Sequence, residues 1–179
     1  MRKQIIIIAL VIISACSSQN HEQQLKSYVD DPDNKITQAI TVGDVGVVSR
    51  FLPASYRSLY KPGNETQTSE VKADDYYYFN VKFNKKVTDK QDKEQLMYLN
   101  FDMQKDFTLV TNNNDSIAPA ICQKIENGIK GSYEYMLAFE KNDNDQGGFT
   151  LLYHDNIFSI GTVAFSYNEK DILKIPGTK

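Results

Sequence analysis

Side chains alternate in character along "DYYYFNVKFN", residues 75–84, and this alternation limits the folds open to the chain. On an extended chain one face carries Tyr77, Phe79, Val81 and Phe83, and the other carries Tyr78, Asn80 and Lys82. A period of two with aromatic and β-branched side chains is typical of a strand with one buried face. The segment therefore predicts a half-buried β-strand.

The same pattern recurs along the chain, and turn-forming residues separate the repeats. Further strands are predicted in "MYLNFDM" (97–103), "DFTLVT" (106–111), "APAICQKI" (118–125), "SYEYMLAFE" (132–140), "GFTLLYHD" (148–155) and "GTVAFSYN" (161–168). Ahead of them, residues 36–53 predict a hairpin that turns at Gly43-Asp44. Helices do not alternate with the strands, so the pattern indicates a mainly β domain, an antiparallel sandwich or barrel, rather than a doubly wound α/β sheet.

Residues 16–35 predict a tether that ends in a short helix. The spacing of Leu25, Tyr28 and Val29 gives one apolar stripe on such a helix. Pro32, in "DDPDN", is expected to end it, because proline disrupts a helix interior. The β domain is then expected to occupy residues 36–179.

Residues 1–15 predict a secretory signal. Arg2 and Lys3 precede an apolar stretch over 5–13, which is too short to cross a bilayer, since crossing takes about 20 residues. The stretch ends in Ile13-Ser14-Ala15-Cys16, which resembles the bacterial lipobox. This resemblance implies that Cys16 receives a diacylglyceryl group and becomes the first residue after cleavage. An ordinary signal peptide followed by a cysteine is the alternative.

A lipidated Cys16 would fix where the protein resides. Two acyl chains, such as palmitate, anchor a protein stably, whereas one gives only marginal binding. The protein would therefore stay on a membrane without a transmembrane helix. Ser17, the next residue, is not the acidic retention signal known from enteric bacteria, which favours the outer membrane of the cell envelope.

The charge balance argues against a nucleic-acid partner. The net charge is −3, and removal of Arg2 and Lys3 with the signal would make it −5. Basic and acidic residues are interspersed, as in "KKVTDKQDKEQ" (85–95), whereas nucleic-acid binding requires a basic stripe. The expected partners are the membrane, through Cys16, and a protein of unknown identity.

Residues suited to metal or nucleophilic chemistry are scarce. His21 lies in the tether, so His154 is the only imidazole of the predicted domain, and Asp155 beside it would point to the opposite face of a strand. Cys122 is expected to be a small buried hydrophobe, with a reactive or intermolecular thiol as the alternative. The segment "DNDQGG" (143–148) imitates a calcium loop but lacks its later ligands. We therefore expect no metal, no cofactor and no enzymatic activity.

Tyrosine offers the best candidates for a binding surface, with 11 residues against no tryptophan. In "DYYYF" (75–79), one set of alternate tyrosines must face away from the core if the other set is buried. Tyr76 and Tyr78 are therefore predicted to form a partner-facing patch, since a phenol ring offers contact area and a directional hydrogen bond. The alternative is that they only cover a sheet face or lie under a loop.

Taken whole, the chain resembles small envelope lipoproteins with an immunoglobulin-like sandwich, of the sort frequent in the Bacteroidota. The likeness lies in the lipobox, a short helix before Asn34-Lys35-Ile36, and aromatic strands ending near "DILKIP" (171–176). The leading hypothesis is a lipid-anchored, non-enzymatic module that binds or assembles a protein partner. An immunity lipoprotein against a toxin and an accessory lipoprotein of a secretion apparatus remain open. A hydrolase that uses paired carboxylates is a third class.

Overall fold

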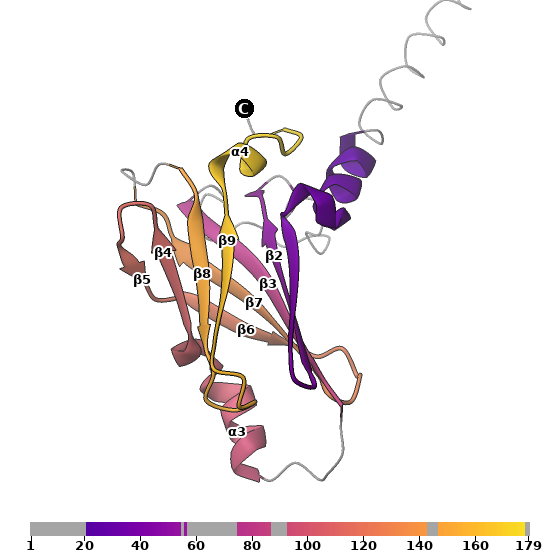
Figure 1. The fold of residues 1–179 in the computed structure, drawn as a ribbon, viewed down its shortest axis with the longest axis vertical. Helices are drawn as coiled ribbons and strands as arrows, with labels where there is room; N and C mark the ends of the chain where they lie inside the picture. Colours follow the sequence, from indigo (N-terminus) through magenta and orange to yellow (C-terminus); the bar gives the residue numbers. More distant parts are fainter. Residues whose placement is uncertain (1–20, 55, 57–74, 87–92, 143–146, 178–179) are drawn as a thin grey trace, which may run out of the picture.

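Two antiparallel β-sheets packed face to face form the body of the protein (Figure 1). The structure, a computed structural model, describes residues 21–54, 56, 75–86, 93–142 and 147–177. One sheet has the strand order β1-β2-β3-β7-β6, and the other has the order β5-β4-β8-β9. The predicted mainly β, antiparallel sandwich is confirmed.

The strands and short helices follow one another along the chain with these bounds. The five-stranded sheet contains β1 (Thr37–Val42), β2 (Val45–Leu52), β3 (Tyr76–Lys85), β6 (Ile121–Ile125) and β7 (Ser132–Glu140). The four-stranded sheet contains β4 (Phe107–Thr111), β5 (Ser116–Ile117), β8 (Phe149–His154) and β9 (Thr162–Tyr167). The helical elements are η1 (Pro32–Asn34), α3 (Lys93–Phe101), η3 (Met103–Asp106) and α4 (Glu169–Ile172), and residues 21–30 are also helical.

The strand order is that of an immunoglobulin-like sandwich. Strands β2, β3, β7 and β6 lie in the order A-B-E-D of such a domain, and β9, β8, β4 and β5 lie in the order G-F-C-C′. Strand β1 is an addition at the edge of the sheet, and it pairs with β2 through the predicted turn at Gly43-Asp44. Gly43 has a φ of +60°, a left-handed conformation that glycine adopts without steric cost.

Aromatic rings from both sheets form the centre of the core. The Phe83 ring on β3 contacts the Tyr153 ring on β8 with centroids 4.7 Å apart, and Phe79 meets Phe149 edge to face at 5.6 Å. Such tilted and edge-to-face pairs suit the charge distribution of the rings. Together they account for the period of two on β3, because every second side chain enters this layer.

The segment around 97–103, predicted as a strand, is instead helix α3 followed by η3, and that prediction was wrong. Leu99 and Met103 are buried, whereas Met97 and Phe101 are exposed. The two buried residues are four positions apart, and so are the two exposed ones, as expected for two faces of a helix. The four positions 97, 99, 101 and 103 also have the period of two that is typical of a strand. Strong helix formers such as Lys93, Glu94 and Leu96 decide between the two patterns.

The helix over residues 21–30 packs onto the sandwich. Leu25 and Val29 are buried in the main hydrophobic core, and the helix ends two residues before Pro32. Figure 1 places this helix and α4 at the upper end of the molecule and α3 at the lower end. We call these ends the N-terminal pole and the α3 pole.

Candidate functional site

Two of the sequence-predicted features lie outside the described residues. Cys16, the predicted lipid attachment residue, precedes the first described residue, His21. Asp143 and Asp145 of the calcium-loop imitation fall within 143–146 and are likewise not described. Their predicted roles stay predictions.

The predicted patch of Tyr76 and Tyr78 is not a surface of two exposed tyrosines. The two rings do share one face of β3, with centroids 6.0 Å apart. Tyr78, however, is only 5% exposed, and Tyr76 is half-buried. The prediction for Tyr78 was therefore wrong.

The neighbours of Tyr78 across the sheet share its burial. Leu52 on β2 and Ala138 on β7 lie directly opposite it, and both are buried on the same outward face. Pro53 and Tyr56, which follow β2, are buried as well. The outward face of the sheet is therefore buried around Tyr78. Alternation along one strand shows which way a side chain points, but it does not show whether other parts of the chain bury that face.

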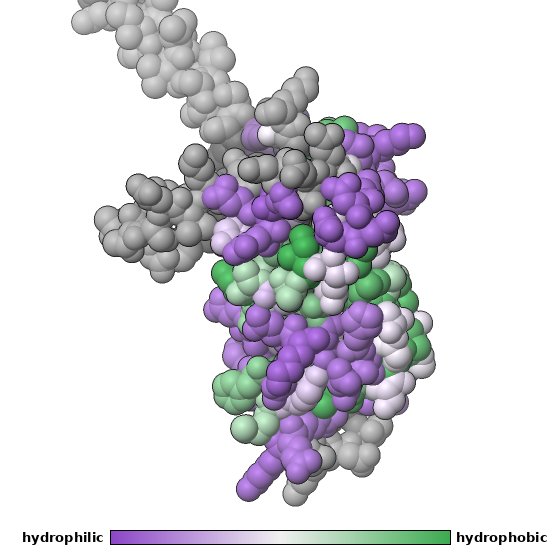
Figure 2. Space-filling view, turned by 90° about the vertical axis from the view of Figure 1, so that its left-hand side faces the viewer, coloured by the Kyte–Doolittle hydropathy of each residue, from purple (hydrophilic) through white to green (hydrophobic). Residues whose placement is uncertain are grey.

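The most exposed apolar surface of the described elements lies on α3. Leu96, Met97 and Phe101 are 40%, 59% and 73% exposed, although all three are large and apolar. Their burial would be favourable, by about 25 cal/mol per Å² of apolar surface. Figure 2 shows green apolar atoms projecting at the lower end of the molecule, where α3 lies, next to hydrophilic ones.

A buried carboxylate holds α3 to the sandwich. The Tyr98 hydroxyl donates a hydrogen bond of 2.5 Å to Oδ1 of Asp106, and the Asn156 side-chain amide donates a second, of 2.8 Å, to the same oxygen. Asp106 is 0% exposed, and its Oδ2 has no hydrogen-bond partner in the described structure. Burial raises the pKa of Asp106, whereas the two hydrogen bonds lower it, and the net effect is a raised pKa.

This cluster joins three separate parts of the chain at the α3 pole. Tyr98 comes from α3, Asp106 ends η3, and Asn156 lies in the connection between β8 and β9. Burial, with the hydrogen bond to Asp106, raises the pKa of Tyr98 to about 12, so its hydroxyl remains a donor at neutral pH. The cluster was missed in the sequence because 97–103 was interpreted as a strand.

His154 and Asp155 do not form a catalytic pair. The His154 ring is exposed, and its Nδ1 lies 3.3 Å from Oγ1 of Thr162. The Asp155 carboxylate accepts backbone hydrogen bonds from Ile157, Phe158 and Ile160 and a further one from the Tyr153 hydroxyl. Asp155 therefore shapes the β8–β9 connection rather than orienting the imidazole.

Cys122 lies on β6, as predicted, and packs against the core while remaining partly exposed. Burial, with a smaller effect of the Asp106 charge, raises the pKa of Cys122 to about 12. Because the thiolate is the reactive form, this environment suits a structural thiol better than a nucleophile.

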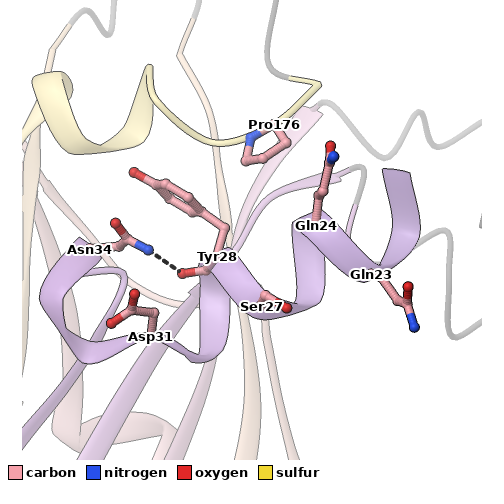
Figure 3. A pocket seen from close by; sticks show the side chains of 7 residues that line it. All are labelled: Gln23, Gln24, Ser27, Tyr28, Asp31, Asn34 and Pro176. Atoms are coloured by element: carbon pink, nitrogen blue, oxygen red, sulfur yellow. Dashed lines mark hydrogen bonds between the residues drawn. The ribbon is translucent and has the colours of Figure 1, made fainter. Parts of the chain in front are cut away.

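A shallow polar groove of about 600 Å³ lies at the N-terminal pole, between the helix over 21–30 and the C-terminal segment (Figure 3). Its lining consists of Gln23, Gln24, Ser27, Tyr28, Asp31, Asn34 and Pro176. The Asn34 amide donates a 3.0 Å hydrogen bond to the backbone carbonyl of Tyr28, as the dashed line in Figure 3 marks. Most polar groups of the lining are amides and hydroxyls, which suit hydrogen bonding to a ligand better than acid–base chemistry.

Neither a metal cluster nor a membrane span is found in the part of the chain that the structure describes. No group of three or more His, Cys, Asp and Glu side chains within it could hold a metal ion. Its helices are too short or too polar to cross a bilayer.

Comparison with known proteins gives similarity at the level of solved structures alone. No protein-family model matches the chain, and no curated protein matches it. A DUF4426 family protein from Pseudomonas aeruginosa PAO1 is similar over 75% of this chain and 93% of its own, with 12% identity and a TM-score of 0.42. A protein of unknown function from Burkholderia pseudomallei K96243 is similar over 91% of this chain and 93% of its own, with 10% identity and a TM-score of 0.42.

Proposed function

We propose that the protein is a lipid-anchored module of the bacterial cell envelope that binds a protein partner and catalyses no reaction. Acyl chains on Cys16 hold it to the membrane, and the outer membrane is the favoured location. The lipobox Ile13-Ser14-Ala15-Cys16, after its short apolar stretch, supports the anchor. The scarcity of imidazole and free thiol supports a role in binding rather than catalysis.

The observation that carries the binding role is the exposure of Leu96, Met97 and Phe101 on a single nine-residue helix. Exposed apolar side chains that gather on one element mark interaction sites in soluble domains. The other side of the same helix is fixed to the sandwich, because Leu99 is fully buried and the Tyr98 hydroxyl is hydrogen-bonded to Asp106. A partner would therefore meet a preorganised surface, which lowers the entropic cost of binding.

The anchor is tested by the variant Cys16→Ser in cells fed labelled fatty acid. The variant should accumulate as an uncleaved precursor without label, because serine offers no thiol for alkylation. Cys122→Ser is the matched control, and it should be labelled and cleaved like the wild type. Unchanged labelling of Cys16→Ser would contradict the lipid anchor.

The binding role is tested by affinity capture of the lipidated protein from its own membranes, followed by mass spectrometry. A protein captured by the wild type should be lost with the double variant Met97→Ser, Phe101→Ser. Leu173→Ser is the control, because Leu173 is an equally apolar side chain, 65% exposed, that follows α4 at the other pole. Equal capture by all three forms would exclude α3 as the binding surface.

A further inference from the structure

The helix over 21–30 is built into the domain rather than appended to it. Leu25 and Val29 are 1% and 0% exposed, and Ile175 of the C-terminal segment is 2% exposed in the same core cluster. Each of these side chains contributes about 1.5–3 kcal/mol when it is withdrawn from water. The helix therefore cannot leave the sandwich without exposing core side chains.

Polar contacts fix the direction of this helix as well as its position. The Thr37 hydroxyl on β1 donates a 2.7 Å hydrogen bond to the carbonyl of Val29. Arg50 on β2 forms a 3.0 Å ion pair with Asp30, and the Tyr28 hydroxyl donates to the carbonyl of Asp171 at 3.2 Å. The ion pair is partly exposed and contributes little energy by itself. These contacts connect the helix to both the sheet and the C-terminal segment, so the helix cannot rotate relative to the domain without breaking some of them.

The chain between the predicted anchor and this helix is short. Only residues 17–20 separate Cys16 from His21, the first described helical residue. Whatever its conformation, this stretch spans at most about 18 Å, since a chain extends by no more than about 3.6 Å per residue. Strand β3 alone, with ten residues, is about 33 Å long at the usual rise per residue. The tether is thus shorter than the domain that it holds.

We infer that the domain stands on the membrane with its N-terminal pole against the lipid headgroups and its α3 pole directed away from them. This orientation rests on the proposed lipid anchor at Cys16. The shallow groove around Tyr28 then lies at the bilayer side, and the exposed apolar face of α3 is presented outward, where a partner can reach it.

Electrostatic attraction to anionic lipid headgroups does not hold the N-terminal pole against the membrane. Lys26 is paired with Glu22 at 2.7 Å, and Lys174 is paired with Asp171 at 3.2 Å. Lys35 and Lys170 lie at this pole too, but Asp33 and Asp171 lie within two residues of them in the chain. The described residues of this pole therefore form no purely basic cluster of the kind that binds anionic lipids. The orientation should therefore persist at high salt, which would weaken an electrostatic contact.

The absence of tryptophan from the chain allows a direct test. Single variants Gln23→Trp, at the N-terminal pole, and Met97→Trp, on α3, are purified in lipidated form and placed in phosphatidylethanolamine–phosphatidylglycerol vesicles that contain a dansyl-labelled headgroup. Energy transfer from tryptophan to dansyl should be several-fold stronger from position 23 than from position 97, at low and at high salt. Equal transfer, or stronger transfer from position 97, would overturn the inference.

A variant with a longer tether tests whether the short tether sets the orientation of the domain on the membrane. A flexible insertion of 20 glycine and serine residues after Ser18, with a root-mean-square span of about 25 Å, should bring the two transfer signals closer together. An unchanged difference would mean that the tether does not set the orientation, which also overturns the inference. The mass of each preparation reports lipidation separately. Protein without lipid would refute the proposed anchor and this inference together, whereas lipidated protein without preferred orientation refutes the inference alone.

Discussion

The hydroxyl of Tyr98 donates a 2.5 Å hydrogen bond to the carboxylate of Asp106, and this contact joins α3 to the end of η3. The second carboxylate oxygen of Asp106 is buried without a partner in the described structure. A buried charge with one unsatisfied oxygen disfavours the ionised form, which agrees with the raised pKa of this group. Helix α3 is therefore hydrogen-bonded to a carboxylate that destabilises the fold when it is charged.

Asp106→Asn should change how stability depends on pH. The folded-state pKa of Asp106 lies above the ordinary value of 3.8, so folding favours the protonated form. The wild type should then lose stability relative to the variant as pH rises from below 3.8 through the folded-state pKa, and the difference should level off above it. Urea unfolding at intervals from about pH 3 to about pH 7 measures this. Asp102→Asn, a half-buried neighbour that pairs with Lys105, is the control. A pH-independent difference between wild type and Asp106→Asn would contradict the prediction.

Asp155 should respond to pH in the opposite direction. Burial alone would raise its pKa, but hydrogen bonds from the backbone N–H groups of Phe158, Ile157 and Ile160 outweigh it, and the pKa is lowered. The stability contributed by this carboxylate is present above the ordinary pKa of 3.8 and is lost as pH falls through the lower folded-state value.

Asp155→Asn should therefore lower the free energy of unfolding by about 1–3 kcal/mol at neutral pH, because the amide nitrogen cannot accept the bond from Ile160. The loss should shrink in acid, where the wild type also loses its charge. Chemical denaturation at neutral and acid pH provides the measurement. Asp115→Asn, an exposed residue that contributes its backbone carbonyl to a turn, should have little effect at either pH. A loss of equal size at both pH values would show that the charge is not responsible.

Met97 and Leu99 distinguish a helix from the strand that their spacing also predicts. On a strand the two side chains would share one face, whereas on α3 Leu99 is 0% exposed and Met97 is 59% exposed. Leu99→Ala should cost about 2–5 kcal/mol, and Met97→Ala should change stability by no more than about 0.5 kcal/mol. Thermal or urea unfolding of the two variants checks this. Similar losses of stability in the two variants would contradict the assignment of this segment as a helix.

Most of the sandwich could be predicted from the sequence because its strands carry two independent signals. Along β7, for example, Tyr133, Tyr135, Leu137 and Phe139 alternate with outward residues and are all buried. Turn residues, such as those at Gly43-Asp44, mark where strands end. Alternating side chains and turn residues together were sufficient to predict every strand of the four-stranded sheet except the two-residue β5.

The candidate site was harder to predict, because its features depend on contacts between distant segments. The four-residue spacing of Leu99 and Met103 satisfies a helix and a strand equally, so this spacing alone cannot decide between them. The outward position of Tyr78 was predicted correctly, but its burial was not, because alternation along β3 does not show that the neighbouring Leu52 and Ala138 are buried on the same face. The exposed surface of α3 could not be identified while the segment was interpreted as a strand.

A buried hydrogen bond between the two sheets offers a last test of the fold. The Tyr167 hydroxyl on β9 donates to Oγ of Ser49 on β2 at 2.7 Å, and both residues are at most 2% exposed. Burial raises the pKa of Tyr167, so the phenol remains a neutral donor. Tyr167→Phe and Ser49→Ala should each cost about 1–3 kcal/mol, because each leaves the other group buried without its partner.

The double variant should cost less than the sum of the two single variants, with a coupling energy of about 0.5–3 kcal/mol. Urea unfolding of the four forms gives this energy directly. Ser166→Ala, on the neighbouring residue of β9, removes an exposed hydroxyl that lies 3.2 Å from Thr150 Oγ1 and should cost no more than about 0.5 kcal/mol. Additive losses at positions 49 and 167 would mean that the two hydroxyls do not hold the sheets together, and the packing of β9 against β2 would then need revision.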